Sequence, residues 1–364
     1  MRGSTTRQAT FTAITPDQKV PKNHPIRRIR ALVEPMLREL SPVFEEMYAV
    51  SGRPSIPPEH LLKATLLMTL YSVRSERQFC ERLEYDLLFK WFLDLNLEDP
   101  AFDASTFSKN RGRLLEHDVA GRFMQAVLDE AQRRRLLSAE HFTVDGTLLE
   151  AWASLKSFRP RDEQEPPGGA GRNPERDFRG KPRKNDTHAS TTDAEARLYT
   201  KSKGQAARLC FMAHALMENR NGLLLDILVT PATGTAERDG AITLLKRRRG
   251  VHKRATVAAD KAYDTRDFIA QCRAQDVTPH VAQNLSNRKS AIDGRVTRHE
   301  GYTVSQRKRK LVEEGFGWMK TVGAARKLRY IGVLKNQFWM TMEAIAYNLV
   351  RMANLEASPA CTAG

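Results

Sequence analysis

Apolar residues recur at helical spacing through the first third of the chain. Ile29, Leu32, Val33 and Met36 lie three and four positions apart, a period that predicts an amphipathic helix. The run "PPEHLLKATLLMTL" follows, and its two prolines stand at a helix start, where a missing N–H has no consequence. The pattern predicts an all-helical bundle over residues 25–136.

Possible caps mark where two further helices of this bundle begin. Ser75 precedes the run "ERQFCERLEYDLL", and either Asp103 or Ser105 precedes the next helical run. Serine and aspartate side chains accept hydrogen bonds from the first amides of a helix, so these residues predict helix starts.

The periodicity changes near residue 140, where short apolar runs typical of strands begin. "HFTV" ends in Asp145-Gly146, a dipeptide that predicts a turn after the strand. Two longer apolar runs are separated by "NRNG", which predicts a hairpin. The strands "RATVAAD" and "VTPHVA" then alternate with helices. This order predicts an α+β fold, in which a helical N-terminal module precedes a mixed sheet with flanking helices.

Composition divides the chain into parts. Residues 1–24 are polar and basic, which predicts a flexible arm, and residues 357–364 form a tail. Between the helical module, 25–136, and that tail, residues 137–356 form the part that contains the sheet. Within this part, residues 157–190 are rich in proline, glycine and arginine and have few apolar side chains. Such a segment buries too little surface to order itself, so we expect a disordered basic insertion.

Charge is the most informative bulk property of the chain. The 59 lysines and arginines outnumber the 43 acids and give a net charge of +16, which favours a polyanionic partner such as nucleic acid. The four cysteines include no CxxC pair, a spacing that supports neither a zinc knuckle nor a disulfide framework and fits a reducing cytosol. No signal peptide is recognisable, and no apolar run reaches the ~18 residues of a membrane span. We expect a soluble, cytoplasmic protein that binds no membrane.

The helices predicted over residues 57–116 end in a basic one, which carries Lys109, Arg111 and Arg113. Short helices joined by tight turns and ending in such a helix are typical of helix-turn-helix DNA-binding modules. An ordinary helical packing module has the same pattern, and the two interpretations stay open at this point.

Asp145 and Asp260 each follow a run predicted to be a buried strand. If the two strands are neighbours, both carboxylates emerge at the same edge of the sheet. Mg²⁺ prefers a few carboxylates together with water and substrate phosphate, and a pair of such ions can drive phosphodiester cleavage. A turn residue at Asp145 and a helix cap at Asp260 are the simpler alternatives.

The segment "RKRKLVEEGFGWMK", residues 307–320, contains two adjacent acids. At ~100° per residue, Arg309, Glu313 and Lys320 share one face of a continuous helix. Glu314 lies ~140° from Arg309, off that face. We therefore predict Glu313 as the acid that points to a site. An exposed helix with an i,i+4 pair between Arg309 and Glu313 is the alternative.

Together these features resemble the DDE transposases of bacterial insertion sequences. In one branch of them the third acid lies in a Tyr-x-x-Arg-x-x-x-Glu-x-x-x-x-x-x-Lys signature, and here Gln306 stands at the tyrosine position. The surroundings "VEEGFGW" and the upstream runs "GRPSIPPEHLLKATLL", "FKWFLDL" and "DASTFSKNR" are most similar to the insertion sequence five family. The resemblance covers roughly residues 50–350.

The resemblance implies a ribonuclease H-like catalytic core in which Asp145, Asp260 and Glu313 hold two Mg²⁺ ions, for which Mn²⁺ can substitute. It implies that the protein binds the terminal inverted repeats of its own element and cuts and pastes DNA as a homodimer on transposon ends and target. Phosphate contacts are expected from the basic residues near the glutamate and on the basic helix of the helical module: Lys308, Arg309, Lys320, Lys109, Arg111 and Arg113. A ribonuclease H-like nuclease without strand transfer and a DNA-binding protein without catalysis are the rival hypotheses.

Further residues are weaker candidates for substrate contacts. Lys261 and Tyr263 follow the second acid, and local packing explains them equally well. Trp318 has the chemistry to stack on a base, although its angular position favours packing. The polar stretch after the first acid adds a last group, for which a surface loop is the alternative: His188, Asp193, Arg197 and Lys203.

Overall fold

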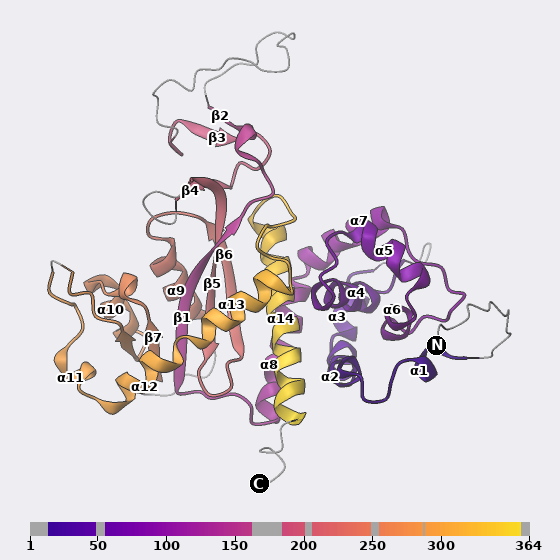
Figure 1. Cartoon of the computed structure of the whole chain (residues 1–364), viewed down its shortest axis with the longest axis horizontal. Helices are drawn as coiled ribbons and strands as arrows, with labels where there is room; N and C mark the ends of the chain where they lie inside the picture. Colours follow the sequence, from indigo (N-terminus) through magenta and orange to yellow (C-terminus); the bar gives the residue numbers. More distant parts are fainter. Residues whose placement is uncertain are drawn as a thin grey trace, which may run out of the picture.

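The N-terminal part of the chain folds into short helices around a shared apolar core (Figure 1). The computed structural model describes residues 14–48, 55–161, 184–200, 206–248, 255–286 and 288–357. The helices of this part are α1 (Pro16–Lys19), α2 (Pro25–Glu39), α3 (Ser41–Glu46), α4 (Pro58–Leu70), α5 (Glu76–Tyr85), α6 (Leu87–Phe92), α7 (Ala104–Glu116) and α8 (Val119–Arg133). Leu61, Phe79 and Phe123 are among the side chains that this core buries completely. The predicted helical bundle is confirmed.

Helices begin where the sequence predicts them. α4 starts at Pro58, and Pro57 is its N-cap residue. Ser75 accepts a hydrogen bond from the backbone N of Gln78, 3.1 Å away, at the start of α5. Of the two alternatives at α7, the cap is Asp103, which accepts from the backbone N of the residue two positions on, at 2.7 Å. These contacts satisfy amides that a helix start leaves without a partner.

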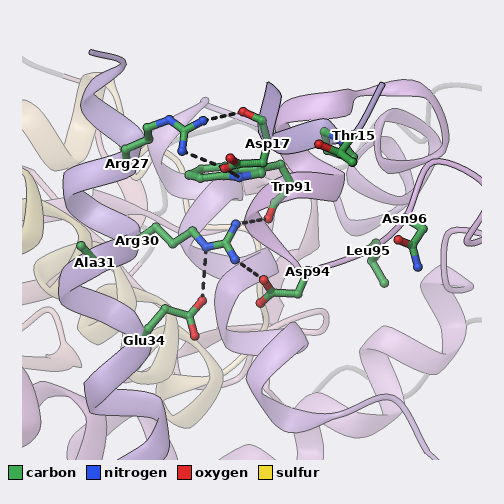
Figure 2. A pocket seen from close by; sticks show the side chains of 11 residues that line it. Thr15, Asp17, Arg27, Arg30, Ala31, Glu34, Trp91, Asp94, Leu95 and Asn96 are labelled. Atoms are coloured by element: carbon green, nitrogen blue, oxygen red, sulfur yellow. Dashed lines mark hydrogen bonds and ion pairs between the residues drawn. The ribbon is translucent and has the colours of Figure 1, made fainter. Parts of the chain in front are cut away.

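Residues 14–24 pack against the helical part, so the predicted flexible arm is wrong for them. Asp17 of α1 accepts hydrogen bonds from the indole Nε1 of Trp91 and from Arg27, both at 2.8 Å. The guanidinium groups of Arg27 and Arg30 lie 4.8 and 4.4 Å from the centre of the Trp91 ring (Figure 2). Charge-assisted hydrogen bonds and cation–π contacts therefore hold this segment. The preceding residues of the predicted arm lie outside the described part of the chain.

One mixed sheet forms the centre of the second part. Its strands are β1 (His141–Glu150), β4 (Arg197–Tyr199), β5 (Arg208–Glu218), β6 (Leu224–Pro231), β7 (Ala255–Ala259) and β8 (Val277–Val281). β1, β5 and β6 form an antiparallel meander, and β4 pairs with the start of β5. β7 and β8 extend the sheet on the other side of β1, parallel to it. The predicted α+β fold is confirmed, with the mixed sheet expected of a ribonuclease H-like core.

Helices cover both faces of this sheet. The helices of this part are α9 (Ala236–Arg247), η2 (Lys261–Tyr263), α10 (Arg266–Arg273), α11 (Gly294–Thr297), α12 (Glu300–Lys308), α13 (Leu311–Thr321) and α14 (Val333–Ala357). Side chains of α9 and α10 share an apolar cluster with Val144 and Leu216. Side chains of α13 and α14 share a different cluster with Ala215 and Met217. Because successive strand residues face opposite sides, α9 and α13 lie on opposite faces of the sheet.

The long helix α14 joins the two parts of the molecule. It packs against β6 on one side and against α2, α4 and α8 on the other, as Figure 1 shows. Trp339 and Met342 are buried at this interface. This helix therefore closes the core between the two parts. No helix in the described part of the chain has the length and apolar character to cross a membrane.

The ends of the predicted disordered insertion form a small ribbon beyond the main sheet (Figure 1). β2 (Phe158–Pro160) pairs antiparallel with β3 (His188–Ser190), and a short 3-10 turn, η1 (Leu155–Ser157), precedes it. The rings of Phe158 and His188 stack with their centres 5.5 Å apart. The prediction of disorder is wrong for these ends, because backbone hydrogen bonds and ring stacking hold them. Residues 162–183 lie outside the described part.

Gly240 allows α9 to lie directly on the sheet. A Cβ at this position would overlap the ring of His214, which is completely buried on β5. The His214 Nε2 and the Thr230 hydroxyl are 2.9 Å apart, and burial lowers the pKa of His214 to about 4, so the ring is neutral at pH 7.

We expect Gly240→Ala to lower the free energy of unfolding by about 1–3 kcal/mol, measured by urea denaturation, because the neighbouring ring has to move. Gly112→Ala on α7 is the control, since the space around that position is open. It should be neutral or stabilising by up to ~1 kcal/mol. Equal losses in the two variants would contradict this explanation.

Candidate active site

Asp145 lies in the middle of β1 and is mostly buried. β1 continues beyond it because β5 pairs along the whole strand: Asp145 lies opposite Ala215, and Glu150 lies opposite Cys210. The predicted turn at Asp145-Gly146 is therefore wrong, since the pairing with β5 overrides the local preference of this dipeptide. The Oδ1 of Asp145 accepts a hydrogen bond from the backbone N of Gly146 at 2.8 Å. This bond holds the carboxylate close to its own strand.

Asp260 follows the last residue of β7 and lies beside Asp145. β1 and β7 run parallel, with Thr143 beside Ala258. The paired residues of the two strands end there, and both acids lie two residues further along the chain, where the charge of Asp260 acts on Asp145. The Asp260 carboxylate also accepts from the backbone N of Ala262 at 2.7 Å, as the N-cap of η2. The predicted cap is thus present, and it coexists with the shared position of the two acids.

The helix predicted to carry Arg309, Glu313 and Lys320 is broken in two. α12 ends at Lys308, Arg309 is its C-cap, and α13 begins at Leu311. The predicted common face is therefore wrong for Arg309, because the angular count assumes one continuous helix. Glu313 and Lys320 do share α13, where they lie ~20° apart around the helix axis.

Lys320 connects α13 to the strand of the first acid. Its Nζ donates a hydrogen bond to the Oγ1 of Thr147 at 2.5 Å. Thr147 lies two positions from Asp145, so their side chains emerge on the same face of β1. Val312 and Met319 of α13 are buried in the core beneath. α13 therefore lies across the face of the sheet on which Asp145 emerges.

Burial raises the pKa of Asp145 to about 7, and the negative charges of Asp260, Glu237 and Glu313 add to this shift. The charge of the adjacent Glu314 acts on a different residue, Tyr347 of α14. Burial raises the pKa of Tyr347, and the negative charge of Glu314 adds to this shift. Both glutamates are exposed at the start of α13. Their charges thus act on different neighbours, one on the acids of the sheet and the other on α14.

The donor set is suitable for a divalent cation. Carboxylate oxygens are the ligands that Mg²⁺ and Mn²⁺ prefer. The raised pKa of Asp145 means that its negative charge is poorly stabilised, and a cation beside it would remove that penalty. Among the described residues, no three His, Cys, Asp or Glu side chains already stand at ligand distance from one point. The carboxylates therefore have to turn inward to share an ion.

The basic residues ahead of Glu313 lie at the junction of α12 and α13. Lys308 is exposed, and Arg309 is partly buried. Gln306, at the position of the signature tyrosine, donates from its Nε2 to the backbone O of His280 at 2.5 Å. This contact ties α12 to β8, so the structure gives Gln306 a packing role.

On α7, Lys109 and Arg113 are exposed, whereas Arg111 is held inside the protein. Arg111 forms an ion pair with Glu76 of α5 and lies over the ring of Tyr330, 4.3 Å from its centre. A guanidinium held by an acid and an aromatic ring stabilises helix packing. In this position Arg111 contributes to helix packing, and its contact with DNA stays a prediction.

The candidates near the second acid have different surroundings. Lys261 is exposed, whereas Tyr263 is buried, with its ring edge-on against Phe268 at 5.2 Å. Trp318 is partly buried and meets the ring of Tyr347 edge-on at 5.8 Å. Tyr263 and Trp318 thus occupy packed positions, while Lys261 faces solvent.

The polar stretch after the first acid supports the start of α14. Asp193 is buried and accepts from the backbone N of Gly332 at 3.2 Å. The Nη1 of Arg197 donates to the backbone O of Ala194 at 2.7 Å. The Asp193 bond reaches the residue before α14, and the Arg197 bond lies within the loop. His188 lies in β3. Lys203 lies outside the described residues.

Glu237 is an acid close to Asp145 that the sequence analysis missed. It lies in the first turn of α9, and a Cβ on Gly146 would be 3.0 Å from its Cγ. The sequence offers only a weak signal, since acids are common in first turns, where they stabilise the helix dipole. Only the packing of α9 against β1 brings Glu237 to this place.

Two family profiles match the chain in order. A profile described as "Transposase domain (DUF772)" matches residues 14–113, and one described as "Transposase DDE domain" matches residues 177–349. The second match contains Asp260 and Glu313, and Asp145 lies between the two matches. No curated protein matches the chain.

Solved structures with low sequence identity also resemble the chain. A piggyBac transposase synaptic complex with hairpin DNA has 10% identity and a TM-score of 0.43, and covers 92% of this chain and 77% of its own. A pre-cleavage Mos1 transpososome has 10% identity, a TM-score of 0.22 and coverages of 93% and 94%. A Mos1 paired-end complex with the left transposon end has 11% identity and a TM-score of 0.21, and the match covers 85% of this chain and 95% of that one. Because all three TM-scores are below 0.5, the family of the chain is assigned from the two family profiles alone.

Proposed function

The chain belongs to the DDE transposases, and on this premise we propose that Asp145, Asp260 and Glu313 hold two divalent metal ions at the place where DNA is cut and rejoined. Mg²⁺ is the expected ion, and Mn²⁺ substitutes for it because both take oxygen ligands. One observation carries the proposal. The charges of Asp260, just after β7, and of Glu313, on α13, both act on Asp145.

When bound, two such ions activate a water or a 3′-hydroxyl and stabilise the leaving oxygen of a phosphodiester. Asp145 is the fixed ligand of the three, since it lies within a strand that is paired over its whole length. Asp260 at the start of η2 and exposed Glu313 at the start of α13 have more freedom to turn inward. Three carboxylates would hold the ions without supplying every ligand, so water and a phosphate of the DNA could supply the others.

Cations beside the acids bind the DNA backbone in this proposal. Lys320 is held at Thr147, close to Asp145, where a positive charge offsets the repulsion between carboxylates and phosphates. Lys308 and Arg309 extend the basic surface along the junction that precedes Glu313. Lys109 and Arg113 on α7 add contacts from the helical part.

We further propose a division of labour along the chain. Residues 25–136 bind the terminal inverted repeats, and residues 137–356 carry out catalysis. The net charge of +16 suits such a DNA partner. A cut-and-paste reaction brings two transposon ends to one target, so the protein acts as a homodimer on DNA. We also propose that the chain belongs to the insertion sequence five branch, which the sequence around Glu313 supports.

A strand-transfer assay tests the proposed function. Duplexes that carry the inverted repeat flanking the gene are mixed with the protein, Mg²⁺ and a supercoiled plasmid. We expect nicked transposon ends and ends joined to the plasmid. Nicks without joined product would indicate a nuclease that transfers no strand, and a gel shift without nicks would indicate a protein that only binds DNA. Either outcome rejects the proposal.

Removal of divalent ions should stop the chemistry and preserve DNA binding. In EDTA we expect cleavage to fall by about 10³-fold or more, since such ions contribute several kcal/mol of transition-state stabilisation. The Kd for the transposon end, measured by gel shift, should change less than about threefold, because the cations of the surface remain. Mg²⁺ or Mn²⁺ added back should restore cleavage. Cleavage that persists in EDTA would contradict the metal site.

A further inference from the structure

The first turn of α9 reaches β1 at the residue next to Asp145. α9 covers the face of the sheet opposite to α13, and Glu237 lies at its start. A Cβ on Gly146 would be 3.0 Å from the Cγ of Glu237 and 3.4 Å from the Nδ1 of His214. The missing side chain at position 146 therefore lets the stem of Glu237 lie against the strand that carries Asp145.

A buried hydroxyl faces the same group of acids. Tyr263 is 1% exposed, and its hydroxyl has no hydrogen-bond partner among the described residues. Burial raises the pKa of Tyr263 well above its usual value, and the charges of Asp145, Glu237 and Asp260 add to this. These charges act on the hydroxyl because it lies near them. A buried hydroxyl without a protein partner is typical of a place where water, or the hydration shell of an ion, is bound.

We propose that Glu237 is a fourth carboxylate of the metal site, contributed from the face of the sheet opposite to α13. The inference rests on the proposed function, because it requires divalent ions at Asp145. Two divalent ions carry four positive charges, whereas Asp145, Asp260 and Glu313 supply three negative ones. Glu237 balances the remaining charge, and carboxylate oxygen is a ligand that these ions prefer.

A simpler role for Glu237 is to stabilise the start of α9. Acidic side chains in the first turn of a helix interact favourably with its dipole. Asp239 lies in the same turn, is exposed, and can do the same without approaching Gly146. Asp239→Asn is therefore the matched control, because it removes one negative charge from the same helix turn.

The experiment measures binding of Mn²⁺ alone to the full chain without DNA, by the electron paramagnetic resonance signal of the free ion. We expect Glu237→Gln to weaken Mn²⁺ binding by about tenfold or more, and Asp239→Asn to leave it within about twofold of wild type. Equal binding by wild type and Glu237→Gln overturns the inference and leaves the proposed function intact. Equal weakening in the two variants also overturns it. Wild type that binds no Mn²⁺ overturns both.

A second variant tests the geometry and keeps every carboxylate. Gly146→Ala places a Cβ against the stem of Glu237 and should weaken Mn²⁺ binding by a similar factor. Because both changes act through one side chain, the double variant with Glu237→Gln should bind Mn²⁺ no more weakly than the single variants. Losses that multiply would overturn the inference. Circular dichroism and thermal melting check the fold of each variant.

Discussion

Glu313→Gln should reduce cleavage and joining of transposon ends by more than about 100-fold, whereas Glu314→Gln should stay within about twofold of wild type. Loss of a side chain that merely supports a metal ligand costs 10–100-fold, so loss of a ligand should cost more. The charge of Glu313 acts on Asp145, and that of Glu314 acts on Tyr347. The readout is the rate of nicked and joined product in Mg²⁺ under single-turnover conditions.

The two variants form a matched pair. Each removes one negative charge from the first turn of α13 and keeps a side chain of the same shape. General effects on DNA affinity or on the helix dipole therefore cancel in the comparison. Similar activity of Glu313→Gln and wild type would reject the proposed set of acids. Equal loss in both variants would show that the charge of the helix matters and not the position of Glu313.

Asp145→Asn should abolish cleavage and, in the absence of divalent ions, stabilise the protein at pH 8. Burial, with neighbouring negative charges, raises the pKa of Asp145 from 3.8 to about 7. Between these two pH values the Asp145 carboxyl keeps its proton in the folded protein and loses it in the unfolded chain. The stability that this proton provides is fully present below pH 3.8 and is lost as the pH rises through about 7. The free energy of unfolding should fall by on the order of 2–4 kcal/mol over this pH range.

Urea denaturation in EDTA at pH 5 and at pH 8 measures this effect. At pH 8 the asparagine variant should be more stable than wild type by that amount, and at pH 5 the difference should shrink. Mn²⁺ should stabilise the wild type at pH 8 more than the variant, because a ligand that binds only the folded state raises its stability. Asp239→Asn is the control, being an exposed acid on α9. A variant no more stable than wild type at pH 8 would contradict the unfavourable ionisation of Asp145.

Local signals predicted much of the fold because they act between residues close in sequence. Ser75 and Asp103 cap α5 and α7 as predicted, since a cap depends only on the next turn of the helix. The hairpin between β5 and β6 follows from the Asn-Gly turn, where Gly222 has a φ of +71°. The strand that ends before Asp260 was also recognisable, because a buried parallel strand is a short apolar run.

The predictions that failed depend on partners far apart in sequence. Asp145-Gly146 has the chemistry of a turn, yet β5 pairs with it and keeps it in the strand. Arg309 and Glu313 have the spacing of one helix face, but the chain breaks between α12 and α13, with Gln306 tied to β8.

The order of helices and strands and the basic charge follow from the sequence alone. The choice of Asp145, Asp260 and Glu313 as candidates also came from the sequence. Periodicity, caps and motif spacing depend on residues close together in the sequence, so they can be recognised without the structure. The sequence also favoured Glu313 over Glu314. Tertiary structure alone brought Asp260 and Glu313 close enough for their charges to act on Asp145. It alone also brought Glu237 to the same strand. These placements result from strand pairing and helix packing between segments that are distant in sequence. A pattern of neighbouring residues does not report the energies of such contacts.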